Sequence, residues 1–203
     1  MMELIVKIIA LVFAVIIHEV AHGYAAYLLG DPTAKRAHRL TLNPIAHIDL
    51  FGSIILPLVL VFAGSPVLLG WAKPVPFNPA YFRDPRRGIM IVGAAGPAVN
   101  FLAALASAAL LRLVGPAAPL LAHFLVFFCA TNLILGIFNL IPIPPLDGSR
   151  IVLGLLPDEL VPAYLKLEQF GFIIIFALLW LGLLDYAVFP LFRFLLGWLL
   201  ASN

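Results

Sequence analysis

Three titratable residues interrupt an apolar stretch near the start of the sequence. The stretch reads VIIHEVAHGY (residues 15–24), and His18 and His22 are four residues apart. In a helix this spacing puts both imidazole rings on one face, about 6 Å apart, so that they can bind one metal ion. Glu19 follows the first histidine and is placed to activate a water molecule, as in the His-Glu-x-x-His pattern of zinc hydrolases. Hydrogen bonding between helices is the alternative role for the histidines, but an ionisable cluster in an apolar helix favours a functional site.

The composition is that of an integral membrane protein. Of the 203 residues, 64% are hydrophobic and 11% are charged, and the mean hydropathy is +1.12. Several apolar runs reach about 18 residues or more, the length that a helix needs to cross a bilayer. The net charge of +2 gives no reason to expect nucleic acid as a partner. With Cys129 as the single cysteine, the chain has no disulfide framework.

The hydrophobic pattern predicts one all-α polytopic membrane domain over residues 1–203. It has about five to six hydrophobic segments, with a core of three transmembrane helices. The core helices are expected at 3–29, 89–114 and 117–141. We expect the catalytic core to cover about 3–155 and the C-terminal hydrophobic segments to cover about 168–200, as 169–184 and 186–200.

Two features of the first half do not fit simple spanning helices. Residues 51–70 are apolar but contain Pro57, Gly64 and Pro66. These breaks favour a re-entrant hairpin, with a spanning helix as the alternative, since irregular backbone is tolerated where protein or water surrounds it. The polar residues 31–50 include HRLTLN, which predicts a short membrane-associated strand, and residues 73–78 are a second candidate for such a strand.

The basic residues predict how the chain crosses the membrane. Loops 31–50 and 71–88 are both rich in lysine and arginine, and the positive-inside rule puts both in the cytoplasm. Both can lie on that side if 51–70 re-enters, and the segment around Asp147 then emerges there as well. His22 lies eight residues before Gly30. At 1.5 Å per residue, we expect the site about 12 Å below the cytoplasmic end of its helix.

A catalytic zinc ion usually has three protein ligands and one position open to water. Asp147 is favoured as the third ligand, because prolines at 142, 144 and 145 break the preceding helix and allow an extended segment to return towards the histidines. His47 and Asp49 are the next candidates. All the residues considered for the third ligand are Asp31, His38, His47, Asp49, His123, Asp147 and Asp185.

Three longer motifs are HEVAHGYAAYLLGD, AAGPAVNF and GIFNLIPIPPLDGSRIV. Together they resemble the site-2 proteases, a family of intramembrane zinc metalloproteases, from about residue 10 to 155. HRLTLNPIAHID and GWAKPVPFNP are similar to the small bacterial branch without a PDZ or CBS domain. The resemblance implies that Asp147, in the LDG motif, joins His18 and His22 as a zinc ligand and that Glu19 is the general base. It also implies that Asn139 lies near the active site, where it binds substrate backbone or the developing oxyanion; a helix-capping or bundle hydrogen bond is the alternative.

The function expected from this resemblance is zinc-dependent endopeptidase activity on peptide bonds within or near transmembrane segments, with Zn2+ as cofactor. The expected partners are a single-pass transmembrane protein or peptide as substrate and the lipid bilayer. The expected location is the bacterial inner membrane, with several crossings and the active site towards the cytoplasmic side. The sequence carries no signal for the substrate's identity or for the oligomeric state.

Three other functions are weighed against this one. A catalytically silent scaffold that binds membrane proteins would be favoured by loss of Glu19 or of a ligand, and none is lost. A metal transporter or channel would need a polar path through the outer half of the membrane, and 89–114 and 117–141 carry few polar residues. A membrane zinc protease of the prenyl-processing type would need a downstream glutamate ligand, and Glu159 and Glu168 have no such helical motif.

Overall fold

The computed structural model describes residues 2–55, 58–59, 62, 72–114 and 118–201. Within these residues the regular elements are all helical, and no strand is present among them. The longer helices are α1 (Met2–Leu28), α4 (Pro85–Val114), α5 (Pro119–Asn139), α6 (Asp147–Leu155), α8 (Gly171–Trp180) and α9 (Leu183–Leu200). The shorter elements are α2 (Thr33–Arg36), η1 (Pro44–His47), η2 (Leu50–Ile55), η3 (Pro79–Tyr81), α7 (Val161–Lys166) and η5 (Leu167–Phe170).

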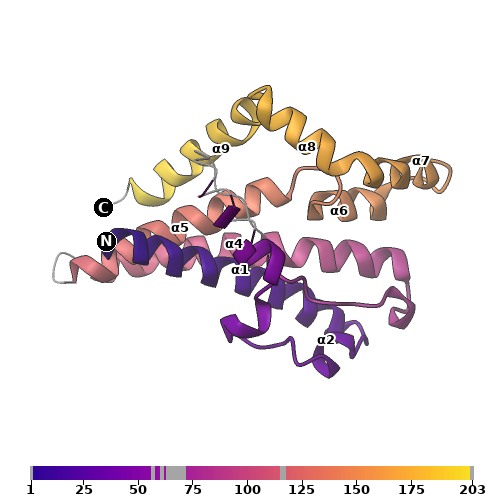
Figure 1. The fold of residues 1–203 in the computed structure, drawn as a ribbon, viewed down its shortest axis with the longest axis horizontal. Coiled ribbons are helices and arrows are strands. Elements are labelled where there is room, and N and C mark those ends of the chain that lie inside the picture. Colours follow the sequence, from indigo (N-terminus) through magenta and orange to yellow (C-terminus); the bar gives the residue numbers. More distant parts are fainter. Residues whose placement is uncertain (1, 56–57, 60–61, 63–71, 115–117, 202–203) are drawn as a thin grey trace.

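Three long helices form the centre of the molecule (Figure 1). α4 contacts both α1 and α5, which also contact each other, and α6 packs on α4. α8 and α9 lie along the α5 side, with α9 packed on α5, and α2 lies on the opposite side. The largest apolar core joins α4, α5 and α9; its buried members are Ala104, Ala108, Cys129, Leu133, Ile137, Leu184, Val188 and Leu199.

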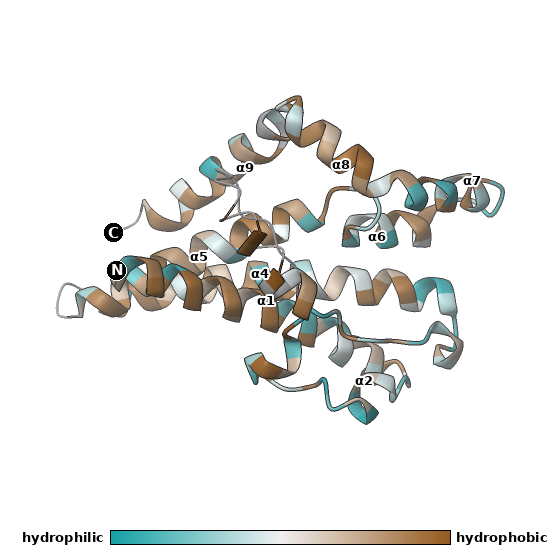
Figure 2. Ribbon diagram, in the orientation of Figure 1, coloured by the Kyte–Doolittle hydropathy of each residue, from teal (hydrophilic) through white to brown (hydrophobic). Residues whose placement is uncertain are grey.

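Among the described residues, four helical stretches are long and apolar enough to cross a membrane. They are Met2–Leu28, Pro85–Val114, Pro119–Asn139 and Val161–Trp180. The first three lie beside one another in Figure 2, and hydrophilic residues gather around α2, α7 and the start of α4. This segregation places the polar connections at one end of the three central helices.

Local sequence explains where the helices begin and end. α1 stops before Gly30, whose φ of 101° is a left-handed conformation that glycine adopts without strain. α4 begins with Pro85, which suits the first helical position because its missing N–H would be unpaired there. The Oδ1 atom of Asp84 accepts hydrogen bonds from the N–H groups of Arg86 and Arg87, at 3.1 Å each. This is the N-cap geometry that stabilises a helix start.

The three expected core helices are present with shifted boundaries. The expected helix 89–114 starts earlier, at Pro85, because the Asp84 cap and Pro85 begin it within the predicted basic loop. The C-terminal part differs more. Helical residues run from Val161 to Trp180, whereas the first C-terminal hydrophobic segment was expected to start only at about 168, and Pro162 lies in the first turn of this run.

Neither predicted strand, in HRLTLN or at 73–78, is observed among the described residues. His38 has a φ of 53°, and the N–H of Arg39 bonds to the carbonyl of Ala34, so the chain continues the turn that ends α2. The predicted re-entrant hairpin over 51–70 lies mostly outside the described residues. Its first part, Leu50–Ile55, forms the π-helical segment η2.

Candidate metal centre

His18 and His22 present their imidazole rings on one face of α1. Both side chains are buried, and their ring centroids lie 4.6 Å apart with the planes perpendicular. The two Nε2 atoms are 3.0 Å apart. The four-residue spacing therefore directs the same atom of each ring to one point.

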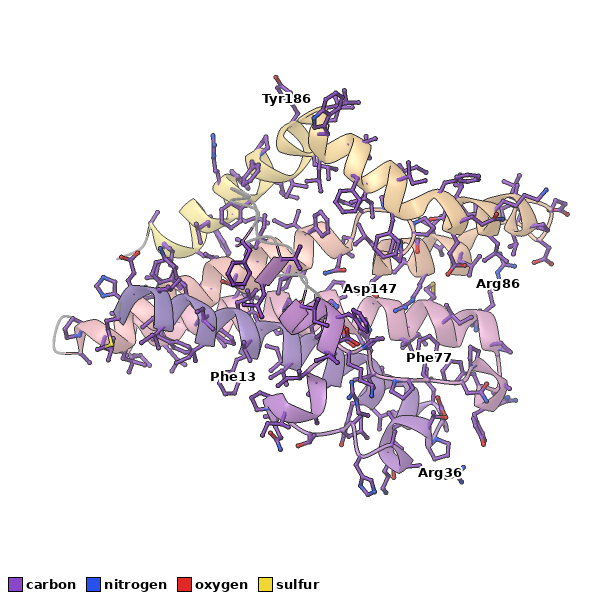
Figure 3. The ribbon with its side chains drawn as sticks, in the orientation of Figure 1. Phe13, Arg36, Phe77, Arg86, Asp147 and Tyr186 are labelled. Carbon is purple, nitrogen blue, oxygen red and sulfur yellow. The ribbon has the colours of Figure 1, made fainter. Side chains whose placement is uncertain are left out.

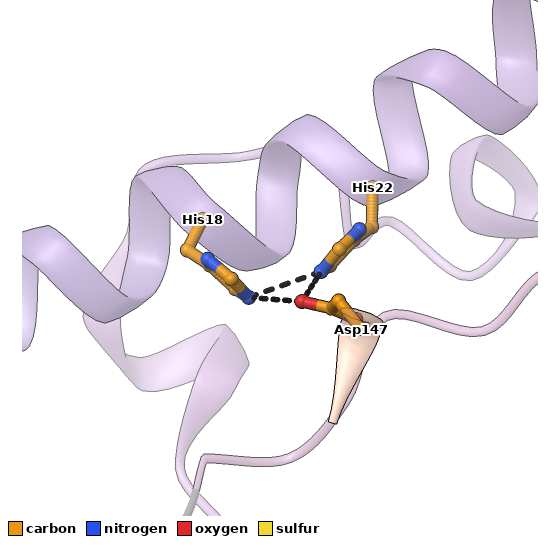
Figure 4. A group of neighbouring side chains, drawn as sticks. All are labelled: His18, His22 and Asp147. Carbon is orange, nitrogen blue, oxygen red and sulfur yellow. Dashed lines mark hydrogen bonds and ion pairs between the residues drawn. The ribbon is translucent and has the colours of Figure 1, made fainter. Parts of the chain in front are cut away.

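Asp147 reaches this point from the first position of α6, 125 residues after His22 in the chain. Its Oδ2 atom lies 3.0 Å from Nε2 of His18 and 3.1 Å from Nε2 of His22 (Figure 4). Figure 3 shows Asp147 in the middle of the molecule, with Arg36 and Tyr186 at opposite edges. Asp147 is 4% exposed, so the carboxylate belongs to the interior.

Hydrogen bonds at the far side of each ring determine which nitrogen faces Asp147. Nδ1 of His18 lies 2.6 Å from Oδ1 of Asn100, and Nδ1 of His22 lies 2.7 Å from the carbonyl oxygen of Val92. Both partners are acceptors, so each Nδ1 carries the proton and donates it. In a neutral ring the Nε2 lone pair then remains free, which is the arrangement found for metal-binding histidines.

Asn100 is held in the orientation that this hydrogen bond needs. Its Nδ2 atom donates to the carbonyl of Ala14 at 3.2 Å and to Oδ1 of Asn132 at 2.7 Å. Asn132 in turn donates to the carbonyl of Phe128 in its own helix at 2.8 Å. Asn100 and Asn132 are both fully buried. Because the amide nitrogen is occupied by two acceptors, the amide oxygen of Asn100 has to face His18.

The three converging atoms fit a zinc ion. With neutral rings, the Nε2 atoms of His18 and His22 and Oδ2 of Asp147 are all acceptors, and Oδ2 is buried without a hydrogen-bond donor. They are 3.0 to 3.1 Å apart. Tetrahedral zinc with bonds of about 2.0–2.1 Å has ligand atoms about 3.4 Å apart, so each pair needs to separate by only about 0.3 Å. A cation at this point would also remove the repulsion between the three lone pairs.

The carboxylate of Asp147 is oriented by Arg150. Nη1 of Arg150 lies 2.9 Å from Oδ1 of Asp147, which leaves Oδ2 for the histidine side. The guanidinium of Arg150 also lies over the ring of Phe77, 5.5 Å from its centroid. Burial raises the pKa of Asp147, but in the metal-free site hydrogen bonds from protonated His18 and His22 lower it more strongly, so the pKa lies below its ordinary value. The carboxyl group is therefore ionised at neutral pH, as a metal ligand must be.

Gly96 of α4 makes room for the two rings. A Cβ atom at this position would lie 2.5 Å from Nε2 of His22 and 2.6 Å from Cε1 of His18. Three residues earlier, a Cβ atom at Gly93 would lie 2.7 Å from Cβ of Arg150. The small residues of α4 therefore allow close packing against both α1 and α6.

Glu19 and Asn139, predicted as catalytic residues, have different surroundings. The Oε2 atom of Glu19 accepts a hydrogen bond of 2.9 Å from the backbone N–H of Val75. Asn139 is half-buried, and its Nδ2 atom donates to the carbonyl of Leu135, one turn back in α5, at 3.0 Å. The amide of Asn139 therefore contacts its own helix.

The two runner-up ligands lie elsewhere. Nε2 of His47 donates to the carbonyl of Thr41 at 2.8 Å, and Oδ1 of Asp49 accepts from the N–H of Gly52 at 2.7 Å. In the part of the chain that the structure describes, one group of three histidine, cysteine or acidic residues can hold a metal ion. Its members are His18, His22 and Asp147.

The residues that surround His18, His22 and Asp147 were not predicted from the sequence. Asn100 and Asn132 carry a detectable signal, since each is an amide within an apolar helix, where polar groups need partners. The carbonyl of Val92 carries none, because every residue has one. Arg150 lies three residues after Asp147, a helical neighbour spacing that indicates an ion pair once α6 is known to start at Asp147.

Comparison with known proteins places the chain in a family. Residues 114–182 match the sequence model described as Peptidase family M50. The chain is 39% identical over 192 residues to the Bacillus subtilis (strain 168) protein named "Putative zinc metalloprotease YwhC". This match covers 91% of this chain and 84% of that protein. It is 30% identical over 167 residues to Rip2 of Mycolicibacterium smegmatis, which has the same description, covering 80% of this chain and 62% of Rip2.

Rip2 of Mycobacterium tuberculosis (strain H37Rv) is 31% identical over 163 residues, covering 80% of this chain and 61% of that protein. The chain thus spans less than two thirds of either Rip2 protein but most of YwhC. No solved structure matches. Because YwhC is 39% identical over 91% of this chain and 84% of its own length, the chain belongs to peptidase family M50, the site-2 protease family of membrane metalloproteases.

Proposed function

We propose that this protein is a zinc-dependent intramembrane endopeptidase, with His18, His22 and Asp147 as zinc ligands and Glu19 as general base. The observation that carries the proposal is the convergence of two Nε2 atoms and one carboxylate oxygen within 3.1 Å. Each ring is fixed by an acceptor at its other nitrogen. Relatives named as zinc metalloproteases support zinc as the ion.

A zinc ion in such a site lowers the pKa of a water molecule and polarises the carbonyl group of the peptide bond. The chain supplies the proton transfers. Glu19 accepts a proton from the attacking water and donates it to the amine nitrogen that leaves as the peptide bond breaks. Asn100 keeps His18 in the tautomer that binds metal, and Arg150 keeps Oδ2 of Asp147 facing the histidines.

The proposed substrates are single-pass transmembrane proteins or peptides. The site is on α1, about 12 Å from its polar end, in a helix apolar enough to cross the bilayer. A substrate helix hides its carbonyl groups in internal hydrogen bonds, so we expect it to unwind locally before cleavage. Asn139 is proposed to bind the unwound backbone or the developing oxyanion, which requires it to leave the Leu135 carbonyl.

We propose the bacterial inner membrane as the location, with the site towards the cytoplasm. The positive-inside rule supports this orientation, since most of the basic residues lie in the segments 31–50 and 71–88, at one end of the central helices. They are Lys35, Arg36, Arg39, Lys73, Arg83, Arg86 and Arg87. The alternative function is a silent scaffold that binds membrane proteins; the presence of Glu19 together with the three-residue metal group favours the protease.

The test uses purified protein in liposomes with zinc and a panel of synthetic single-span peptides, each with a glycine or asparagine near its cytoplasmic end. Products are identified by mass spectrometry. We expect the wild type to cleave at least one peptide within its apolar segment, and Glu19→Gln to bind zinc without cleaving it. No cleavage by the zinc-loaded wild type, or equal cleavage by Glu19→Gln, would favour the scaffold.

A further inference from the structure

The carboxylate of Glu19 is bound by a segment far away in the sequence. Residues 72–78, with the sequence AKPVPFN, form a stretch without helix or strand between the undescribed residues that precede it and η3. The N–H of Val75 in this stretch donates to Oε2 of Glu19 at 2.9 Å. Val75 is 5% exposed, so the residue that donates this hydrogen bond is buried.

The sequence of this segment isolates the donor. Pro74 and Pro76 flank Val75 and have no N–H group, and Pro79 follows the segment. Val75 therefore carries the one amide donor between residues 74 and 76. The prolines also restrict the backbone to extended conformations, which lowers the entropy lost on fixing that donor.

The start of the segment is held by buried groups. The N–H of Lys73 donates to the carbonyl of His47 at 2.9 Å. Nη2 of Arg39 donates to the carbonyl of Lys73 at 2.5 Å and lies 3.3 Å from that of Pro74. Arg39 is 7% exposed, and breaking these hydrogen bonds would leave Nη2 of a buried guanidinium without an acceptor, while Nη1 keeps the carbonyl of Ala46.

The end of the segment is held by an acidic residue. The N–H of Asn78 donates to Oδ2 of Asp31 at 2.6 Å, and Oδ1 of Asp31 accepts from the N–H and hydroxyl of Thr33. Asp31 is fully buried. Between the two ends the side chain of Val75 lies on α1, where a Cβ atom at Gly23 would be 2.5 Å from its Cγ1 atom. The segment is thus fixed on the helix turn that carries His22 and Glu19.

We propose that the backbone N–H of Val75 positions the Glu19 carboxylate for its role as general base, an inference that rests on the proposed function. The N–H holds one carboxylate oxygen and leaves the other for the proton of the attacking water. The alternative is that residues 72–78 cover the site and are displaced by substrate in each turnover. This would break the buried hydrogen bonds of Arg39 and Asp31 each time. These attachments favour a fixed support over a displaceable cover.

The first test compares Val75→Pro with Val75→Ala, using a peptide that the wild type cleaves. Proline removes the N–H, whereas alanine keeps it and shortens the side chain, so the comparison isolates the donor. We expect kcat of Val75→Pro to be about 10- to 100-fold below that of Val75→Ala, because a misplaced base loses most of its contribution. We expect KM and zinc content to be similar in the two variants. Equal kcat values would overturn the proposal, and a higher kcat for Val75→Pro would instead identify a cover.

The second test needs neither a substrate nor a proline variant. Amide hydrogen exchange is measured in the zinc-loaded wild type and in Glu19→Ala, and Val75 is readily assigned because its neighbours Pro74 and Pro76 have no amide hydrogen. We expect exchange at Val75 to be at least about tenfold faster in Glu19→Ala, with Lys73 and Asn78 unchanged. Unprotected Val75 in the wild type, or protection independent of Glu19, would overturn the inference. Absence of peptide cleavage would count against the protease alone, because this exchange result is obtained without it.

Discussion

Replacing Gly96 by alanine adds one methyl group at the point where α4 meets the metal centre. The new Cβ atom would lie 2.5 Å from Nε2 of His22 and 2.6 Å from Cε1 of both His18 and His22, whereas ordinary contacts begin at 3.4 Å. The rings or the helix would therefore have to move by about 0.9 Å, several times the tolerance of about 0.2 Å in metal–ligand distances.

Neither way of relieving this contact preserves the site. If the rings move, the Nε2 atoms leave the positions from which they face Asp147. If α4 moves, it carries away Asn100 and the carbonyl of Val92, which hold the opposite nitrogens of the two rings. Losing such supporting groups typically weakens metal binding by about 10- to 100-fold, and displacing a ligand atom as well puts the expected loss at about 100-fold or more.

The assay is competition for zinc against a chromophoric chelator in detergent, with helix content followed by circular dichroism. Gly197→Ala in α9 is the matched control, because a Cβ atom at Gly197 meets nothing within 4 Å. We expect Gly96→Ala to retain its helices and lose zinc affinity, and Gly197→Ala to bind zinc like the wild type. Wild-type affinity in Gly96→Ala would refute the packing that we describe around the two rings.

Three further substitutions test other parts of the structure. Arg150→Gln removes the charge that holds Oδ1 of Asp147, so zinc should dissociate about tenfold faster into excess chelator, and Arg150→Lys should restore part of the difference. Identical dissociation rates in the wild type and both variants would contradict this role of Arg150. Asp31→Ala leaves the N–H groups of Thr33 and Asn78 without an acceptor and should lower the free energy of unfolding by about 2–4 kcal/mol. Asp31→Asn keeps an acceptor oxygen and should lose less stability. The reverse order of the two variants in denaturant titrations would contradict this role of Asp31. Asp158→Ala breaks the pair with Arg86, but the Asp158 side chain is 89% exposed, so stability should change by less than about 1 kcal/mol in the same titrations.

Short-range spacing carried most of the information that could be read from the sequence. The interval between His18 and His22 predicts a shared face in any helix, and the apolar runs predict α1, α4 and α5 because a membrane span needs a minimum length. The choice of Asp147 over His47 and Asp49 could not be made from spacing, since it depends on how the chain returns after α5. The prolines before Asp147 favoured it, the family resemblance strengthened that preference, and the structure then brings Asp147 to the histidines.

Contacts between distant residues account for what could not be predicted. The hydrogen bond from Val75 to Glu19 joins residues 56 apart and leaves no periodic pattern in the sequence. The hydrogen bond to the carbonyl of Val92 cannot be predicted either, because backbone groups have no sequence signature. The early start of α4 was predictable in principle from Asp84 and Pro85, a cap residue followed by proline at the first helical position.

Zinc content measured on purified wild type, Asp147→Ala and Asp49→Ala tests the proposed ligand set itself. Asp49 is the control because it is the competing carboxylate and accepts a hydrogen bond from Gly52 away from the histidines. We predict about one zinc ion per chain in the wild type and in Asp49→Ala, and little in Asp147→Ala, since catalytic zinc needs three protein ligands. A wild type that binds no zinc after repletion, or an Asp147→Ala variant that keeps it firmly, would contradict the metal centre described here.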